Sequence, residues 1–590
     1  MRDLGAKRFG ILGRLASFLK CKAGNISIIA GFSAVPIFAA VGVAVDSARI
    51  NHEQTMFHAA VDSAVLAIAA DDRSSISGLS GTSLTSRMTT LKQMAKSYIK
   101  TNYESSDAAS GDLTVNLTIT GQQVTLSADL EFPTSIMSLF GVDSIEYTAL
   151  SQVQKAMRPI ELVMVMDTTG SMNDSSKLAG AKAAAQKLLT TLYGGSLASA
   201  PSSEYIRVSL VPFSGAVHLN TSAYDFNLNW IDTTGTNSYS KLNFDASLSP
   251  PSTWNNYTAW AQTKKSSSAY NTWNGCVETR QNGSTASGTD YNINDVAPSS
   301  STPATRFPAY FNPDIYGSSV AENSYGISYL GGTSTSTVGS ECRGLTSTVC
   351  SSTTTANLLQ KQENYYKYVD ANVGTESANP SSTTSSYYGP WGGCAVSKVV
   401  PMTYDRSKVE TGITDMRAHG ITIIPEGLAW GWRVISPTEP FTKVEGFGSL
   451  PNTTLAPYND AKWQKIMVLM TDGDNNVNGG SYTMNVSRYS SYGLGSESLS
   501  SNRFGTTSSS GLDTALDNYT KSLCTKIKTS GVTMYVASFG SDLTSATKTM
   551  LQNCATGTEY YKHASTSADL QAFFDHIGED VINKSIYVSR

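Results

Sequence analysis

Charged side chains are scarce in this sequence: only 15% of its 590 residues are Asp, Glu, Lys or Arg. The net charge of −4 leaves no basic excess, which argues against nucleic-acid binding. The 6 histidines form no pattern typical of a catalytic triad. Gly331-Gly332 lacks the preceding strand and the following Lys-Ser/Thr of a phosphate-binding loop. These absences predict a protein that is not an enzyme.

Cysteine is also infrequent, and the Cys-x-x-Cys pairs that favour a structural zinc site are missing. Of the 7 cysteines, Cys21 precedes a long hydrophobic run and six follow it. The six are Cys276, Cys342, Cys350, Cys394, Cys524 and Cys554. An even set on one side of a membrane fits disulfides in an oxidising compartment.

The hydrophobic run is residues 25–45, which contain no charged side chain. Its length can span a bilayer. The preceding segment, residues 1–24, is basic, which predicts a cytoplasmic N-terminus with the rest of the chain outside. A cleaved signal peptide is the alternative, but its apolar core is usually shorter. We favour a single-pass anchor whose helix continues to about residue 72.

A short apolar strand, Leu162 to Met166, leads into the most informative motif. It ends at Asp167, and after a turn of small residues a helical pattern begins. Asp167, Thr169 and Ser171 therefore fall at the carboxyl end of a strand, where open α/β sheets bind ligands. One carboxylate and two hydroxyls are hard oxygen donors that suit Mg²⁺.

Asp-x-Thr-x-Ser after a buried strand resembles the metal-ion-dependent adhesion site of von Willebrand factor A domains, although serine is usual at the position of Thr169. The resemblance implies two further ligands: Thr422, from the loop that precedes Pro425, and Asp472, which follows the apolar strand that begins at Ile466. It also implies a divalent cation that coordinates a carboxylate of a partner protein, so that the site binds the partner and catalyses no reaction. We expect Mg²⁺, with Mn²⁺ and Ca²⁺ left open.

The same residues also allow simpler interpretations. Asp-Gly after an apolar run is often only a turn. Asp167 and Asp472 could be a pair of acids for hydrolysis, as in glycosidases, but their hydroxyl neighbours fit metal coordination better. His419, the histidine nearest to this site in the sequence, is expected to have a structural role.

The N-terminal region resembles the anchor of TadE/TadG proteins of Tad (Flp) pilus assembly. The similarity lies in Gly24-Asn25, in Val43 to Arg49 and in Ala59 to Ala67. Pseudopilins of that system carry Glu five residues after the glycine at which they are cleaved. Ile29 occupies that position here, so we predict a retained, TadG-like anchor.

Two further segments, Trp273 to Glu278 and Gly427 to Pro437, also resemble TadG-like proteins. We expect the second to be a helix that begins after Pro425 and closes at Ser436-Pro437. The resemblance pairs Cys524 with Cys554. For the other four cysteines, Cys342–Cys350 and Cys276–Cys394 are a hypothesis among the pairings that six cysteines allow.

The expected fold class is α/β. After the anchor, residues 73–157 predict a small α+β module with a helix over 85–104, a hairpin over 112–132 that turns at Gly121, and a third strand over 144–155. Residues 158–590 predict a doubly wound, Rossmann-like von Willebrand factor A domain. A long insertion at 220–400 and a smaller one at 474–510 interrupt it.

The long insertion is rich in Ser, Thr, Asn, Gly and Tyr but also contains tryptophans at 230, 254, 260, 273 and 391. Such aromatic content argues against disorder. We expect these rings mainly to pack the insertion, with sugar or protein recognition as the alternative.

The two resemblances together imply a non-enzymatic Tad pilus assembly or adhesion protein of the bacterial inner membrane, with its bulk in the periplasm or at the cell surface. Its partner would be a pilus component or a surface ligand that presents a carboxylate. The alternative is a purely structural periplasmic scaffold with a vestigial metal site.

Overall fold

The computed structural model of the chain divides into two compact units. One contains Met1–Ala156 and Ile586–Arg590, and the other contains Met157–Ser585. The structure describes residues 25–588 except 72–73, 75, 77–80, 104–112, 121–122, 195–199, 201, 263–272, 281–289, 315–333, 337–339, 341, 353, 371–389, 391, 478–488, 496–502, 505 and 507. The basic segment 1–24 with Cys21, the turn at Gly121, Gly331-Gly332 and Trp391 lie outside the described residues.

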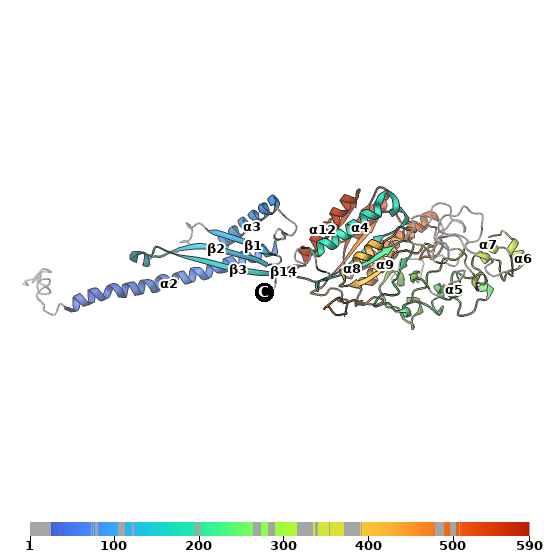
Figure 1. The fold of residues 1–590 in the computed structure, drawn as a ribbon, viewed down its shortest axis with the longest axis horizontal. Helices are drawn as coiled ribbons and strands as arrows, with labels where there is room; N and C mark the ends of the chain where they lie inside the picture. The colour runs from blue at the N-terminus through green and yellow to red at the C-terminus, as the bar shows by residue number, and fades with distance from the viewer. Residues whose placement is uncertain are drawn as a thin grey trace, which may run out of the picture. The chain divides into compact units, whose positions relative to one another are not determined.

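The N-terminal unit combines long helices with an antiparallel sheet (Figure 1). Its elements are α2 (Asn25–Ala70), α3 (Gly81–Asn102), β1 (Thr114–Thr120), β2 (Gln123–Pro133), the 3-10 helix η2 (Met137–Phe140), β3 (Ser144–Met157) and β14 (Ile586–Val588). The sheet order is β1-β2-β3-β14. The predicted helix, hairpin and third strand are confirmed, and β14 is an addition from the far end of the chain.

One face of this sheet packs on the helices. Buried and half-buried residues alternate along most of β2, and its buried side chains share an apolar core with α2 and α3. This period of two is what places one side of a strand against a core. The stretch Ile29–Ala70 of α2 is long and apolar enough to cross a membrane. A signal sequence would meet the same criteria of length and composition.

The second unit is built on a six-stranded sheet. Its strands are β4 (Ile160–Asp167), β5 (Ile206–Phe213), β8 (Val400–Thr403), β11 (Gln464–Thr471), β12 (Thr533–Phe539) and β13 (Tyr561–Ala564). The order is β13-β12-β11-β4-β5-β8, parallel except for β8 at one edge. The chain order reverses between β4 and β11, and open α/β sheets bind ligands at such switch points.

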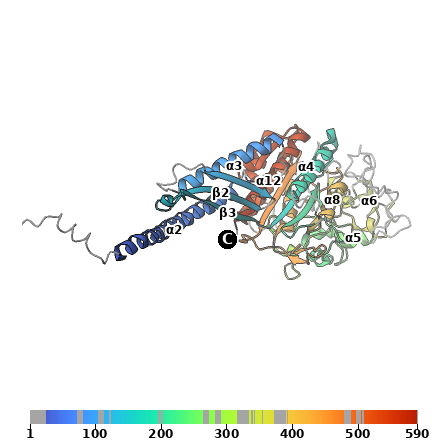
Figure 2. The same ribbon diagram turned by 60° about the vertical axis from the view of Figure 1, so that its left-hand side comes forward.

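Both faces of this sheet are covered, so every residue of β4 is buried. Figure 2 shows α4 (Lys177–Leu192) beside α12 (Ser567–Ser585), and these helices share one apolar core with α8 (Arg406–Asp415). The opposite face carries α9 (Ile424–Ile435), α10 (Ser509–Thr529) and α11 (Ser545–Cys554). Such strands read as continuous apolar runs rather than as alternating ones.

The predicted start of α9 was wrong by two residues. The helix begins at Ile424, and Pro425 lies in its first turn. Proline is tolerated there because the first N–H groups of a helix have no intrahelical partner. The predicted C-terminal boundary is confirmed, since Ser436 caps the helix.

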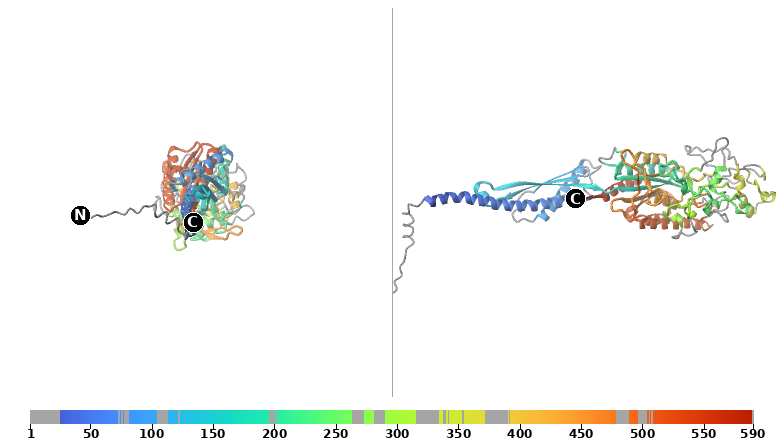
Figure 3. Two further views of the ribbon diagram at one scale, coloured as in Figure 1. Left: turned by 90° about the vertical axis from the view of Figure 1, so that its left-hand side faces the viewer. Right: turned by 90° about the horizontal axis from the view of Figure 1, so that it is seen from below.

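The loop-rich part of this unit gathers at one end of it (Figure 3). Its short elements are β6 (Val217–His218), α5 (Asn256–Gln262), β7 (Cys276–Val277), α6 (Ser347–Ser351) and α7 (Thr355–Gln362). The short strands β9 (Lys443–Val444) and β10 (Thr453–Thr454) lie instead beside the start of β5, where Arg207 donates to the Thr454 carbonyl. Trp230, Trp254, Trp260 and Trp273 are buried in the core that α9 shares, which confirms their packing role. The three expected disulfides, Cys276–Cys394, Cys342–Cys350 and Cys524–Cys554, are all formed.

Candidate metal centre

The five predicted metal ligands meet at the switch point of the six-stranded sheet. Asp167 is the last residue of β4, and Asp472 directly follows β11, its neighbour. The Ser171 hydroxyl donates to Asp472 Oδ1 at 2.7 Å, and Thr169 Oγ1 lies 3.0 Å from Ser171 Oγ. A hydrogen bond thereby joins Ser171 and Asp472, which lie 301 residues apart in the sequence.

Asp167 is completely buried, and both of its oxygens accept a hydrogen bond. The donors are the Thr169 amide at 2.8 Å and the Thr471 hydroxyl at 2.6 Å. Burial and the nearby charge of Asp472 nevertheless raise the pKa of Asp167 to about 7. Two carboxylates in one buried place therefore disfavour the doubly ionised state.

Thr422 reaches the same place from the loop before α9. A Cβ atom built on Gly473 would lie 3.3 Å from Thr422 Oγ1 and 3.8 Å from Ser171 Oγ. The space between these hydroxyls and the backbone of residue 473 is thus one that a side chain would fill. The Asn476 amide donates to the Thr422 carbonyl at 2.9 Å and holds this loop.

The loop after β4 is fixed so that alternate side chains face the site. Thr168 donates through its amide and its hydroxyl to the Phe213 carbonyl, so its side chain faces β5 instead. The His419 amide donates to the Thr168 carbonyl at 2.7 Å, and the Gly170 amide donates to the Gly420 carbonyl at 2.9 Å. These backbone bonds tie the two loops that carry Thr169 and Thr422.

Lys177 is a charged residue of this site that the sequence motifs did not predict. Its Nζ donates to Asp472 Oδ2 and to Asp542 Oδ2, both at 2.9 Å. Burial opposes the charge of Lys177, but the bonds to Asp542 and Asp472 prevail and raise its pKa. A signal existed in the sequence, because a lysine in the first turn of a predicted helix is unfavourable for the helix dipole and calls for an anionic partner.

The chemistry of these donors fits a hard divalent cation. All five predicted ligands offer oxygen: two carboxylates and three hydroxyls. Mg²⁺ prefers such oxygens and needs few carboxylates because it retains several waters. A cation beside Asp167 and Asp472 would also offset the burial and the repulsion that together raise the pKa of Asp167.

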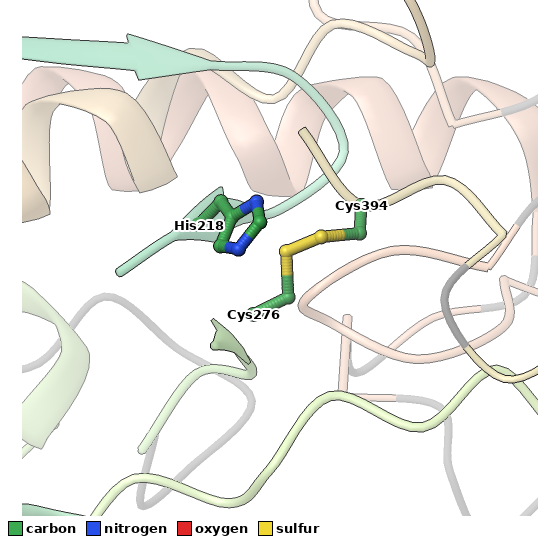
Figure 4. A group of neighbouring side chains, drawn as sticks. All are labelled: His218, Cys276 and Cys394. Carbon is green, nitrogen blue, oxygen red and sulfur yellow. A yellow bond between two sulfur atoms is a disulfide. The ribbon is translucent and has the colours of Figure 1, made fainter. Parts of the chain in front are cut away.

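A second cluster, His218 with Cys276 and Cys394, has ligand atoms within 4.8 Å of one another (Figure 4). Its cysteines form a disulfide and therefore offer no thiolate. His218 Nδ1 lies 3.0 Å from the Ala395 carbonyl and Nε2 lies 2.7 Å from the Asn274 carbonyl. Burial and Lys398 lower the pKa of His218 to about 4. The cluster is a packed disulfide with a buried histidine rather than a metal site.

No family model and no curated protein matches this chain. Among solved structures, the pilus adhesin SpaC from Lactobacillus rhamnosus GG aligns over 81% of this chain and 34% of its own, at 11% identity and TM-score 0.31. The vWF domain of the type V pili tip protein Mfa5 from Porphyromonas gingivalis aligns over 73% of this chain and 97% of its own, at 9% identity and TM-score 0.29.

Proximal thread matrix protein 1 from the mussel byssus, with a zinc-occupied MIDAS motif, aligns over 32% of this chain and 34% of its own. Its identity is 20% and its TM-score is 0.18. The chain spans about a third of the length of SpaC. Similarities this low carry no conclusion about function.

Proposed function

We propose that this chain is a membrane-anchored, non-enzymatic binding protein of the TadG-like pilus assembly type. Its binding site would be a von Willebrand factor A metal centre formed by Asp167, Thr169, Ser171, Thr422 and Asp472. The observation that carries this proposal is that two buried carboxylates and three hydroxyls converge at one switch point from three separate segments.

The protein's own contribution would be to hold oxygen donors in place before any partner arrives. Thr471 and the Thr169 amide orient Asp167, while the Ser171 hydroxyl orients Asp472. A divalent cation bound there would supply an open coordination position for an oxygen of a partner. A carboxylate on a partner protein is the best match, since it adds the negative charge that a hard cation favours.

The remaining parts of the proposal have separate support. The sheet order with a single antiparallel edge strand is compatible with a doubly wound A domain interrupted at 220–400 and at 474–510. The apolar surface of α2 supports a single-pass anchor over residues 25–45. A periplasmic or cell-surface location suits three disulfides.

A structural scaffold is the second candidate, and Lys177 is the observation that favours it. Its ammonium group already lies 2.9 Å from Asp472 and neutralises part of the site's charge. In that case the polar cluster would stabilise the ends of β4 and β11 without a cation.

The two candidates predict different results when Mg²⁺ is titrated into the full-length protein in detergent and the heat of binding is measured by calorimetry. Asp167→Ala should abolish saturable Mg²⁺ binding. Asp174→Ala, in the exposed part of the same loop, should leave it unchanged and serves as the matched control. Equal heats for the wild type and Asp167→Ala would reject the metal centre and leave the scaffold.

A further inference from the structure

An exposed apolar tip closes the hairpin between β2 and β3. Residues 135–142, Ser-Ile-Met-Ser-Leu-Phe-Gly-Val, contain no charged side chain. Leu139 is 80% exposed, Phe140 53% and Val142 39%. Three large apolar side chains exposed within four residues usually mark an interaction surface.

The hairpin runs along α2 toward the apolar end of that helix (Figure 1). Its partners on α2 come ever closer to the N-terminus as the hairpin approaches its tip. Phe57 contacts Phe132, Arg49 donates to the Pro133 carbonyl, Asp46 binds Ser135, and Gly42 lies against Ile136. The next residues of the tip, 137–140, form η2, which also contacts α2.

Two features hold the tip firmly on the helix. The buried Asp46 carboxylate accepts the backbone amides of Ser135, Ile136 and Met137, the last two at 2.8 and 2.7 Å. A Cβ atom on Gly42 would lie only 2.2 Å from Ile136 Cγ2, so the helix and the loop touch without an intervening side chain. The position of the tip along α2 is therefore fixed.

That position coincides with the outer end of the predicted membrane span. An α-helix rises about 1.5 Å per residue, so Gly42 lies roughly 4.5 Å inside Val45, the last residue of the span. Val41 and Val45 are each 53% exposed, as expected for side chains that face lipid. Ile136, which packs on Gly42, thus reaches the edge of the hydrocarbon layer, and the exposed Leu139 and Phe140 lie in η2 directly after it.

We propose that the 135–142 tip is a second membrane contact, inserted into the interface of the outer leaflet beside the anchor. This inference rests on the proposed anchoring by residues 25–45. Burial of apolar side chains in this interfacial layer is favourable, because it removes apolar surface from water. The partner is the lipid surface itself.

The backbone of the tip suits that environment. Irregular backbone is tolerated near lipid only where its polar groups are satisfied. Three amides are bound by Asp46, and the turn closes on itself through Gly141 N to the Ser138 carbonyl and Val142 N to the Met137 carbonyl. A second copy of this chain or a pilus protein would be the competing occupant of the same apolar surface.

Site-specific photocrosslinking can identify the occupant. The crosslinking residue p-benzoylphenylalanine would replace Leu139, Phe140, Phe32 or Leu150, one at a time, in full-length protein reconstituted into phosphatidylcholine vesicles that contain phosphatidylglycerol. Phe32 lies in the span and is 81% exposed, whereas Leu150 is 59% exposed on β3, away from the tip. Mass spectrometry then counts lipid adducts and protein adducts.

We expect lipid adducts at positions 139 and 140 to approach the yield at 32 and to exceed that at 150 by about tenfold or more, since water should surround position 150. Adducts at 32 without any at 139 and 140 would overturn the proposal while sparing the anchor. Loss of adducts at 32 as well would overturn the anchor itself. Protein adducts at 139 and 140 would assign the tip to a second copy or another protein instead.

Discussion

Asp46 in the N-terminal unit and Asp167 in the second unit are both buried, and their surroundings shift their pKa values in opposite directions. Asp46 in the N-terminal unit is 1% exposed and Asp167 in the second unit is 0% exposed. The amides of Met137, Ile136 and Ser135 hold the pKa of Asp46 below its usual range. Burial and Asp472 raise the pKa of Asp167 to about 7.

Neither side chain is open to solvent, but only at Asp46 do the hydrogen-bond donors outweigh the cost of burying the charge. Three N–H donors converge on Asp46, so its negative charge is satisfied within the protein. Asp167 has one amide and one hydroxyl and faces a second carboxylate. A buried carboxylate that accepts several N–H bonds is stable as an anion and fixes the local structure. A buried carboxylate that lies beside another carboxylate is suited to bind a cation.

The largest contrast should come from replacing each aspartate by asparagine in the metal-free protein. Asp167→Asn removes a buried charge and its repulsion with Asp472, and it should stabilise the second unit by on the order of 1–3 kcal/mol near pH 8, since each unit of pKa shift is worth about 1.4 kcal/mol. Asp46→Asn should destabilise the N-terminal unit, because an amide accepts the three backbone N–H bonds less strongly. Denaturation in chelator would measure both.

Hydrogen exchange serves as the control for this experiment, because two units need not unfold together. The amides of Ile136 and Met137 should lose protection in Asp46→Asn alone. If both substitutions destabilised the protein, the buried pair at Asp167 and Asp472 would be a structural hydrogen-bond network and the contrast between the units would fail.

A smaller effect should appear as a pH dependence of the second unit. The pKa of Asp167 rises from 3.8 to about 7 on folding, so the folded state holds an extra proton between these values. Its contribution to stability is therefore full below about pH 4 and is lost as the pH rises to about 7. Mg²⁺ affinity should increase over the same range, because the cation must displace that proton.

Calorimetry in buffers of different ionisation enthalpy would count the released protons. We expect close to one proton per Mg²⁺ near pH 6 and close to none near pH 8. Asp167→Asn cannot be compared here, because it replaces a proposed ligand and should not bind Mg²⁺. Asp174→Ala is therefore the matched control. Proton release that did not vary with pH would show that Asp167 is already ionised.

The smallest expected effect concerns Lys177, whose ammonium group competes with a cation for Asp472. Lys177→Met should raise Mg²⁺ affinity severalfold, because it removes a buried positive charge that repels the cation. Lys182→Met removes a lysine of the same helix that donates to the Thr414 carbonyl instead, and it should change nothing. A weaker affinity in Lys177→Met would mean that the lysine positions Asp472 for the metal.

Much of the architecture could be predicted from local pattern. Alternation along 123–132 specified a one-sided strand, and the continuous apolar runs before Asp167 and Asp472 specified strands buried on both faces. The loop motif then located the candidate ligands, because carboxyl ends of neighbouring parallel strands meet at one edge. The bridging role expected of these ligands stays a prediction.

The contacts that could not be predicted join distant segments through single side chains. The sequence around Lys177 does not indicate that its partner is Asp542, which lies 365 residues away. Asp46 likewise follows an apolar run, and only the folded hairpin brings the amides of residues 135–137 to it. The return of residues 586–588 to the sheet of β3 depends on tertiary pairing of three residues, too few for a pattern.

That return has a mechanical consequence. The chain leaves the N-terminal sheet after β3 and re-enters it as β14, its neighbour, so residues 157–585 are a loop closed at both ends on one sheet. A pull on a ligand held by this loop would be divided between two strands of the same sheet rather than carried by one linker. Part of the load would then enter the sheet through β14, which its hydrogen bonds to β3 hold in place.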